Sequence, residues 1–498
     1  MILLVALLLR EVNVNHTLSW DEASNVFATM EQAGPGPVQP LFWPDRFYQH
    51  PPVYLGTGLV FEKVTHADRR QLALFLQFLS ILSSLAVVFL IYLCGKDWFN
   101  EKVGLFAAFF YAILPAARVF DTWIKQNPTM MAFALAFLLF FFRKKWLIAG
   151  LFLGLALLTE ELAIFVVLAV GVYLLVSKRF KDIKVLLLAS AVAAVTSFWW
   201  FVFFSKSTHS FIDFFLGSSE EAKEFANRWY HFLTRIPQDI GWITFAVCIA
   251  AVVMFVVKRK EDKRGMVPFL LVWIVLLYLI FSISYGKAPW LIQTVLPPLA
   301  LLAGWGLYQL ATQIPERRVA FASVALVLAV ALSFSITGSF DNYMQKSASG
   351  FSWWQADRDS ATYINQNKGQ RVMMRVDDFD PVLAYYINSV SPDSVTYLLA
   401  NAPAGATSDS SLFLVDPATS FDLFRQRISA AAPDYLIIMS VKMGTTNSSE
   451  ISLIDGFKRY ATPVQFGRNV VFNGLKISQR IAAEKQAGAP SAAPGPSP

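Results

Sequence analysis

The sequence predicts a mainly α-helical, polytopic transmembrane bundle followed by a small C-terminal α/β domain. Of the 498 residues, 55% are apolar and only 15% are charged, whereas soluble chains have about 25% charged residues. The apolar residues are gathered in blocks of roughly 15 to 24 residues, long enough to cross a bilayer as helices. After the last block, short β-rich runs alternate with helical segments, which is typical of an α/β domain.

Ten apolar runs predict membrane spans. They are 71–94, 103–118, 128–142, 146–158, 161–176, 184–204, 241–257, 266–285, 290–311 and 319–338. The apolar run Met1–Leu9 is too short to cross a bilayer as it stands and predicts the tail of an eleventh, first span. Trp146–Val176 would be too long as one helix, so we expect a break at Thr159–Glu161.

The basic loops set the orientation of these spans. With the break at Thr159–Glu161, five basic loops all fall on one side; they carry Lys96 and Lys102, Arg143–Lys145, Lys178–Lys184, Lys258–Arg264 and Arg317–Arg318. Loops rich in Lys and Arg stay in the cytoplasm. We therefore expect a multi-pass protein of the cell membrane whose first loop, shorter acidic loops and C-terminal domain are exoplasmic.

Three regions follow from this map. Residues 1–338 form the transmembrane domain, which includes the exoplasmic first loop 10–70, and residues 339–480 form the exoplasmic α/β domain. In that domain we expect strands at 371–376, 412–415, 435–440 and 469–477, and helices at 352–367, 381–387 and 420–430. Residues 481–498, rich in Ala, Pro, Gly and Ser, predict a disordered tail.

Composition also excludes several functions. The net charge of +7 comes mainly from the loops between apolar blocks, so it reflects membrane topology and does not predict nucleic-acid binding. The two cysteines lie in apolar blocks, which argues against a disulfide framework. No cofactor is indicated, and histidines in the first loop give only a weak hint of a divalent metal, with His50 as the candidate ligand.

The first loop holds two acidic candidates. Ser19 and Glu22 fit a capping box at the start of a helix, so Glu22 is a candidate either for capping or for catalysis. Asp21 is not needed for the cap and lies just outside the membrane, where a carboxylate can take a proton from a hydroxyl group.

Other exoplasmic loops supply cations and further polar groups. Arg118 and Lys125 lie at the level of a lipid phosphate, although long cationic side chains at span ends also snorkel to headgroups. Asp121 and Asn127 share this loop as a second acidic or polar site, and Asn127 before Pro128 also fits a helix N-cap. Two more loops add Glu160, from a Thr-Glu-Glu turn, and Lys287, from a Ser-Tyr-Gly-Lys segment.

The order of these motifs resembles the GT-C glycosyltransferase superfamily, in its branch of protein O-mannosyltransferases and aminoarabinose transferases. The resemblance rests on Trp20-Asp21-Glu22-Ala23 followed by His50-Pro51-Pro52. It rests also on the GLALLTEELA stretch that contains Glu160. The stretch SYGKAPWLIQTVLPPLALLAG, from Ser284 to Gly304, is similar to one in a related archaeal and bacterial subgroup associated with lipid-linked sugar assembly. The family usually has a lysine in place of Glu160 and an aspartate in place of Asn127.

The resemblance implies transfer of a sugar from a polyprenyl-phosphate donor in the bilayer to an exoplasmic acceptor, with inversion. It implies Asp21 as the general base. A sugar phosphate already carries a good leaving group, so the chemistry needs a base and phosphate-binding cations, for which Arg118, Lys125 and Lys287 are candidates. Two alternatives stay open, namely a lipid-linked sugar flippase or transporter and a non-catalytic subunit with this fold.

Overall fold

The structure is a computed structural model that describes most of the chain. The described residues are 1–14, 16, 18–33, 50–203, 212–213, 215–217, 227–257, 265–337, 351–375, 381–387, 395–398, 412–415, 421–439, 454–466 and 469–486. They form two compact units. Unit 1 consists of Met1–His16 and Asp45–Ala348, and unit 2 consists of Thr17–Pro44 and Ser349–Pro498. The segment 17–44 thus groups with unit 2, whereas the sequence analysis assigned the whole loop 10–70 to the membrane domain.

The regular structure of unit 1, within its described residues, consists mainly of helices. Its helices are α1 (Ile2–Glu11), α3 (Pro52–Thr65), α4 (Arg69–Trp98), α5 (Glu101–Ile113), α6 (Pro115–Phe120), α7 (Asn127–Phe142), α8 (Trp146–Leu157), α9 (Ala163–Val176), α10 (Phe180–Phe203), α13 (His231–Ile240), α14 (Trp242–Val257), α15 (Met266–Ile283), the 3-10 helix η3 (Pro289–Thr294), α16 (Leu296–Thr312) and α17 (Arg317–Thr337). The predicted break in Trp146–Val176 is confirmed, because α8 ends at Leu157 and α9 begins at Ala163.

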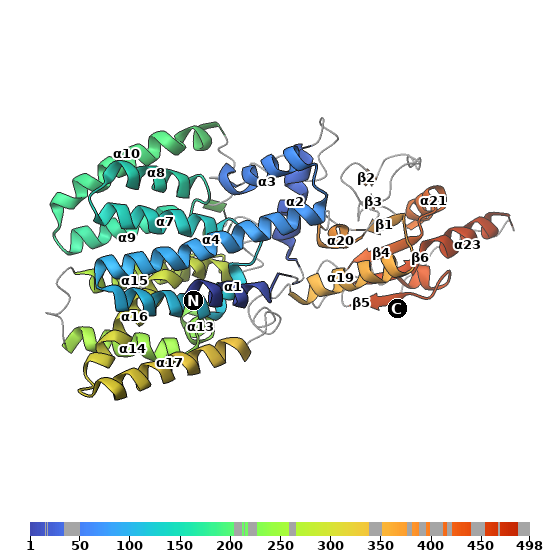
Figure 1. Cartoon of the computed structure of the whole chain (residues 1–498). Helices are drawn as coiled ribbons and strands as arrows, with labels where there is room; N and C mark the ends of the chain where they lie inside the picture. The colour runs from blue at the N-terminus through green and yellow to red at the C-terminus, as the bar shows by residue number, and fades with distance from the viewer. Residues whose placement is uncertain are drawn as a thin grey trace. The chain divides into compact units, whose positions relative to one another are not determined.

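The helices of unit 1 pack as a continuous series (Figure 1). In that series α10, α8, α7, α4, α5, α16 and α14 each contact the next, while α9 packs against α15. Glycine allows the closest approach. A Cβ atom added to Gly304 on α16 would lie 2.6 Å from the backbone nitrogen of Ala107 on α5, so these two helices meet almost backbone to backbone.

Only some of the predicted spans are both long and apolar enough for a full membrane crossing. Among the described residues, three helices are long and apolar enough, namely α4, Phe180–Val202 of α10, and α15. A fourth span is formed if α13 and α14, bent by 110°, count as one broken crossing. The helices α7, α8 and α9 are apolar but shorter, and the predicted number of spans stays a prediction.

Two predicted spans are interrupted, and the first loop is more structured than expected. The span 103–118 divides into α5 and α6 because Pro115 favours an extended Leu114 before it, where ψ is 128°. The span 290–311 begins with η3 before α16. Helices α2 (Trp20–Ala33) and α3 both lie within the segment that the sequence analysis treated as a loop.

Unit 2 is built around a six-stranded sheet. The strands are β1 (Val372–Arg375), β2 (Val395–Leu398), β3 (Leu412–Val415), β4 (Tyr435–Met439), β5 (Val464–Phe466) and β6 (Asn469–Asn473), in the order β2-β3-β1-β4-β6-β5. The first four strands of that order are parallel to one another. β6 pairs antiparallel with both β4 and β5, so it alone among these six strands runs in the opposite direction. The strand expected at 469–477 ends at Asn473, because helix α23 (Gly474–Gln486) begins there.

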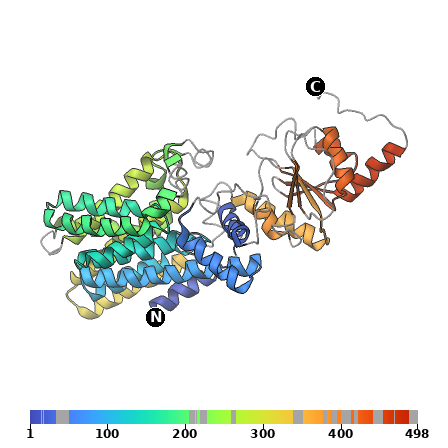
Figure 2. The same ribbon diagram turned by 90° about the horizontal axis from the view of Figure 1, so that it is seen from above.

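Helices cover both faces of this sheet, as Figure 2 shows for the orange strands. Adjacent residues of a strand point to opposite faces, and Val372 and Met373 accordingly enter two different apolar clusters. One cluster includes residues of α2, α19 (Phe351–Gln366) and α20 (Pro381–Tyr386), and the other includes residues of α21 (Phe421–Ala431) and α23. Residues 481–486 of the predicted tail are helical, and the rest of that tail lies outside the described residues.

Candidate functional site

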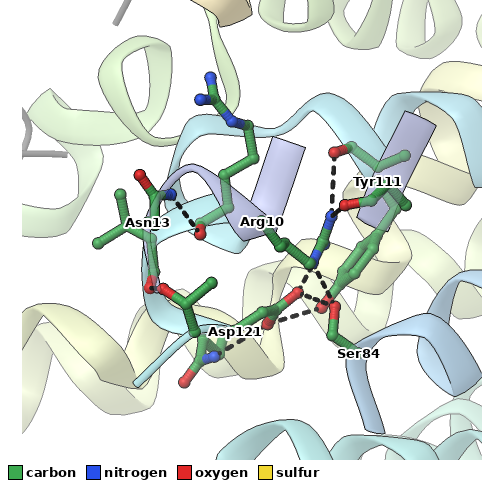
Figure 3. Close-up of polar contacts among 11 residues, drawn as sticks. Arg10, Asn13, Ser84, Tyr111 and Asp121 are labelled. Carbon is green, nitrogen blue, oxygen red and sulfur yellow. Dashed lines mark hydrogen bonds and ion pairs between the residues drawn. The ribbon is translucent and has the colours of Figure 1, made fainter. Parts of the chain in front are cut away.

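A buried ion pair lies between α1 and the loop after α6 (Figure 3). Arg10 Nη2 donates to Asp121 Oδ2 at 2.7 Å, and both side chains are fully buried. Ser84 donates to the same carboxylate oxygen, while Tyr111 and Gln293 donate to the other oxygen at 3.4 and 3.2 Å. The carboxylate thus accepts hydrogen bonds from four side chains on four different elements. Asp121, a predicted member of the second acidic site, therefore ties α1, α4, α5 and η3 together.

Arg10 was missed by the sequence analysis. It directly follows the apolar run Met1–Leu9, a position that usually marks the end of a span and exposure to headgroups. Its Nε also donates to Ser84 at 2.6 Å and its Nη1 to the carbonyl oxygen of Ala112 at 3.2 Å. The sequence signal that could have identified Arg10 was a cation directly next to an apolar segment. A charge buried in a membrane domain pairs with an opposite charge, which here is Asp121.

Lys125, in the same loop as Asp121, contacts two aromatic rings. Lys125 is 7% exposed, and its Nζ lies 3.4 Å from the ring centre of Trp290 and 5.5 Å from that of Trp123. Cation–π contacts of this kind stabilise a positive charge where water is largely excluded. Trp290 lies in η3, so this contact links the loop of Lys125 to the segment that carries Lys287.

Arg118 and Lys287 are also nearly buried. Arg118 is 6% exposed, and its carbonyl oxygen accepts a hydrogen bond from Asn13 at 3.0 Å. Lys287 is 5% exposed and donates to the carbonyl oxygen of Ser284. Burial lowers the pKa of Lys287, because desolvation disfavours its charged form. A phosphate that contacts Lys287 would offset this cost.

A second polar cluster joins three segments. Gln126 Nε2 donates to Glu160 and lies 2.9 Å from His50 Nδ1, and His50 Nδ1 lies 3.9 Å from Glu160 Oε2. The backbone nearby is fixed by a 3.0 Å hydrogen bond from Val53 to the carbonyl oxygen of Leu158. The structure thus brings His50 and Glu160 together. Within the described residues no group of three or more His, Cys, Asp or Glu side chains could hold a metal ion.

Asn127 is buried but does not cap α7 as predicted. The helix begins at Asn127 itself, and the preceding Gln126 has φ −73° with no side-chain cap hydrogen bond. Pro128 therefore occupies the second helical position, one later than expected. Asn127 is 2% exposed, and its Nδ2 has no hydrogen-bond partner among the described residues.

The predicted catalytic acids lie in unit 2, at the start of α2. The capping box is confirmed, because the Ser19 backbone N–H donates to Glu22 Oε2 at 2.7 Å and the Glu22 N–H donates to Ser19 Oγ at 3.3 Å. Glu22 is fully buried, so its carboxylate serves the helix end. Asp21, the residue before Glu22, is partly exposed.

The comparisons with known proteins agree with the fold described above. Residues 49–201 match the family model described as dolichyl-phosphate-mannose-protein mannosyltransferase. The structure of ArnT from Cupriavidus metallidurans bound to undecaprenyl phosphate superposes with a TM-score of 0.61 at 16% identity, covering 95% of this chain and 96% of that one. The chain shares the GT-C fold of this ArnT structure. The resemblance found in the sequence motifs is thereby confirmed, and with its apolar helices the chain is an integral membrane protein.

Two further matches were found, one in sequence and one in structure. An undecaprenyl phosphate-alpha-4-amino-4-deoxy-L-arabinose arabinosyl transferase 2 of Proteus mirabilis is 26% identical over 248 residues. That match covers 45% of this chain and 44% of the relative's length. The apo oligosaccharyltransferase of Archaeoglobus fulgidus superposes with a TM-score of 0.55 at 12% identity, covering 93% of this chain and 72% of that one.

Proposed function

We propose that the protein is a glycosyltransferase that moves a sugar from a polyprenyl-phosphate carrier to an acceptor on the exoplasmic face. The observation that carries this proposal is the pair of nearly buried lysines, Lys125 and Lys287, in two loops that Trp290 joins. Cations in such surroundings suit a phosphate, because charge-assisted contacts strengthen where water is excluded. The fold match to a protein bound to undecaprenyl phosphate supports this choice of carrier.

In the proposed reaction Asp21 is the general base. Its carboxylate takes the proton of the acceptor hydroxyl as that oxygen attacks the anomeric carbon of the sugar. The bond from the anomeric carbon to the phosphate oxygen breaks, and the carrier phosphate leaves with the electron pair. Attack from the face opposite the phosphate inverts the anomeric configuration. Lys125 and Lys287 stabilise the charge that grows on the departing phosphate, and Arg118 is the third candidate for this task.

Purified protein in liposomes provides the test. Radiolabelled polyprenyl-phosphate sugars and membrane extracts are supplied, and the labelled product is identified. The parent is expected to transfer label, and Asp21→Asn is expected to lose transfer while it still binds the carrier lipid. Asp68→Asn is a matched control, because Asp68 caps α4 and Asn caps a helix equally well.

The same assay separates the other candidate functions. A flippase would move the labelled lipid across the bilayer without changing it, and a non-catalytic subunit would leave it unchanged on its own side. Either result for the parent would overturn the proposal. An Asp21→Asn variant with the parent's rate would remove Asp21 as the base and leave the carrier assignment standing.

A further inference from the structure

Unit 2 contains a helix that comes from the first loop of the chain. α2 packs against α20, and its Phe27 is fully buried in one apolar cluster with Ile364 of α19 and Leu383 of α20. A buried Phe contributes much of the apolar area that holds a helix in place. Helix α2, whose first turn contains Asp21, is therefore anchored in the fold that the C-terminal residues form.

One hydrogen bond fixes the start of this helix. The backbone N–H of Leu18 donates to the hydroxyl oxygen of Tyr386, the last residue of α20, at 3.0 Å. Leu18 is buried and directly precedes Ser19, the capping residue. A buried N–H group that loses its acceptor has no water to replace it. Tyr386 thus holds the backbone three residues before Asp21.

The electrostatics keep Tyr386 neutral in this position. Burial raises the pKa of Tyr386, and the negative charge of Glu22 raises it further, while the hydrogen bond from Leu18 acts in the opposite direction. A neutral phenol adds no negative charge next to Asp21. Its ring is fixed in turn by Tyr385, at a centroid distance of 5.0 Å, and by the Arg358 guanidinium, 5.7 Å from its centre.

We propose that Tyr386 is a positioning residue for Asp21, so that the C-terminal unit holds the general base of the transfer reaction. This inference rests on the proposed function. It assigns unit 2 a direct part in the chemical step, because the geometry of the base depends on a side chain from that unit. A displacement of a catalytic group by about 1 Å can cost roughly a hundredfold in rate.

The test removes only the hydroxyl group of Tyr386. In the full-length protein in lipid, Tyr386→Phe is expected to lower kcat by about tenfold or more, with the KM for the carrier lipid nearly unchanged. In the Asp21→Asn background, the Tyr386→Phe substitution should lower kcat no further, because Tyr386 acts only through the base. Tyr363→Phe is the matched control, since Tyr363 packs against the same apolar cluster and its ring contacts Tyr435.

A second measurement does not depend on activity. Hydrogen exchange of the peptide 18–24 should be roughly tenfold faster in Tyr386→Phe than in the parent and in Tyr363→Phe, because Leu18 loses its acceptor. A purely stabilising role would lower the melting temperature and leave kcat per folded molecule at the parent's value. That result would overturn the inference about Tyr386 and leave the proposed function standing. So would an unchanged exchange rate in Tyr386→Phe, if the parent is active and depends on Asp21. A parent that transfers no sugar would overturn the proposed function instead.

Discussion

The Nζ of Lys125 lies 3.4 Å from the ring centre of Trp290. Lys125 lies in the loop after α6 and Trp290 lies in η3, with α7–α10 and α13–α15 between them in the sequence. A second contact between the same segments runs from Gln293 to Asp121 at 3.2 Å. This pairing brings the loop of Lys125 to the segment that contains Lys287. It is the reason why two cations distant in the sequence are candidates for one phosphate.

Replacing either lysine should therefore weaken carrier binding. Lys125→Met and Lys287→Met keep much of the apolar stem and remove the charge, and each charge-assisted contact contributes about 1.5–3 kcal/mol. We expect a loss of about tenfold or more in affinity for the carrier lipid. Affinity measurements on both variants and the double mutant check this, and coupled effects would indicate one shared site. Lys96→Met is the control, because Lys96 is 51% exposed; variants that all bind like the parent would contradict the prediction.

The buried pair of Arg10 and Asp121 should matter for stability. Removing one member of a buried ion pair costs about 3–5 kcal/mol because the other charge stays buried. Arg10→Met is therefore expected to lower the melting temperature of the purified protein by several degrees. Arg143→Met breaks the exposed pair with Asp97, which is expected to contribute about 0.2–1 kcal/mol. Equal melting temperatures for these two variants would show that the Arg10 pair is not a structural anchor.

The contact between α5 and α16 should not tolerate a larger residue. Gly304→Ala places a Cβ atom 2.6 Å from the backbone of Ala107, and overpacking of this kind costs about 1–3 kcal/mol. In Gly171→Ala the added atom meets only a side-chain methyl group at 3.9 Å. We expect a clear loss of thermal stability in the first variant and none in the second. An equal change in thermal stability for the two variants would argue against the close approach of α5 and α16.

The orientation in the membrane is tested by labelling single cysteines in intact cells. Cysteines introduced at Ser410 and at Lys260, both outside the described residues, lie on opposite sides in the predicted topology. A membrane-impermeant reagent is expected to label the first and not the second. The native Cys94 and Cys248 are buried, so they should contribute little background. Equal labelling of both introduced sites would refute the predicted map.

Local patterns in the sequence were enough for most helices and for the capping box. Apolar blocks predict helices, a Thr-Glu-Glu turn predicts the break before α9, and Ser19 with Glu22 predicts the start of α2. These features depend on residues close together in the chain. The other features depend on tertiary packing. Arg10 pairs with Asp121, Lys125 contacts the ring of Trp290, and α2 packs into the C-terminal unit through Phe27. Such contacts join residues from distant segments, and their free energy exists only once water has been excluded from between them.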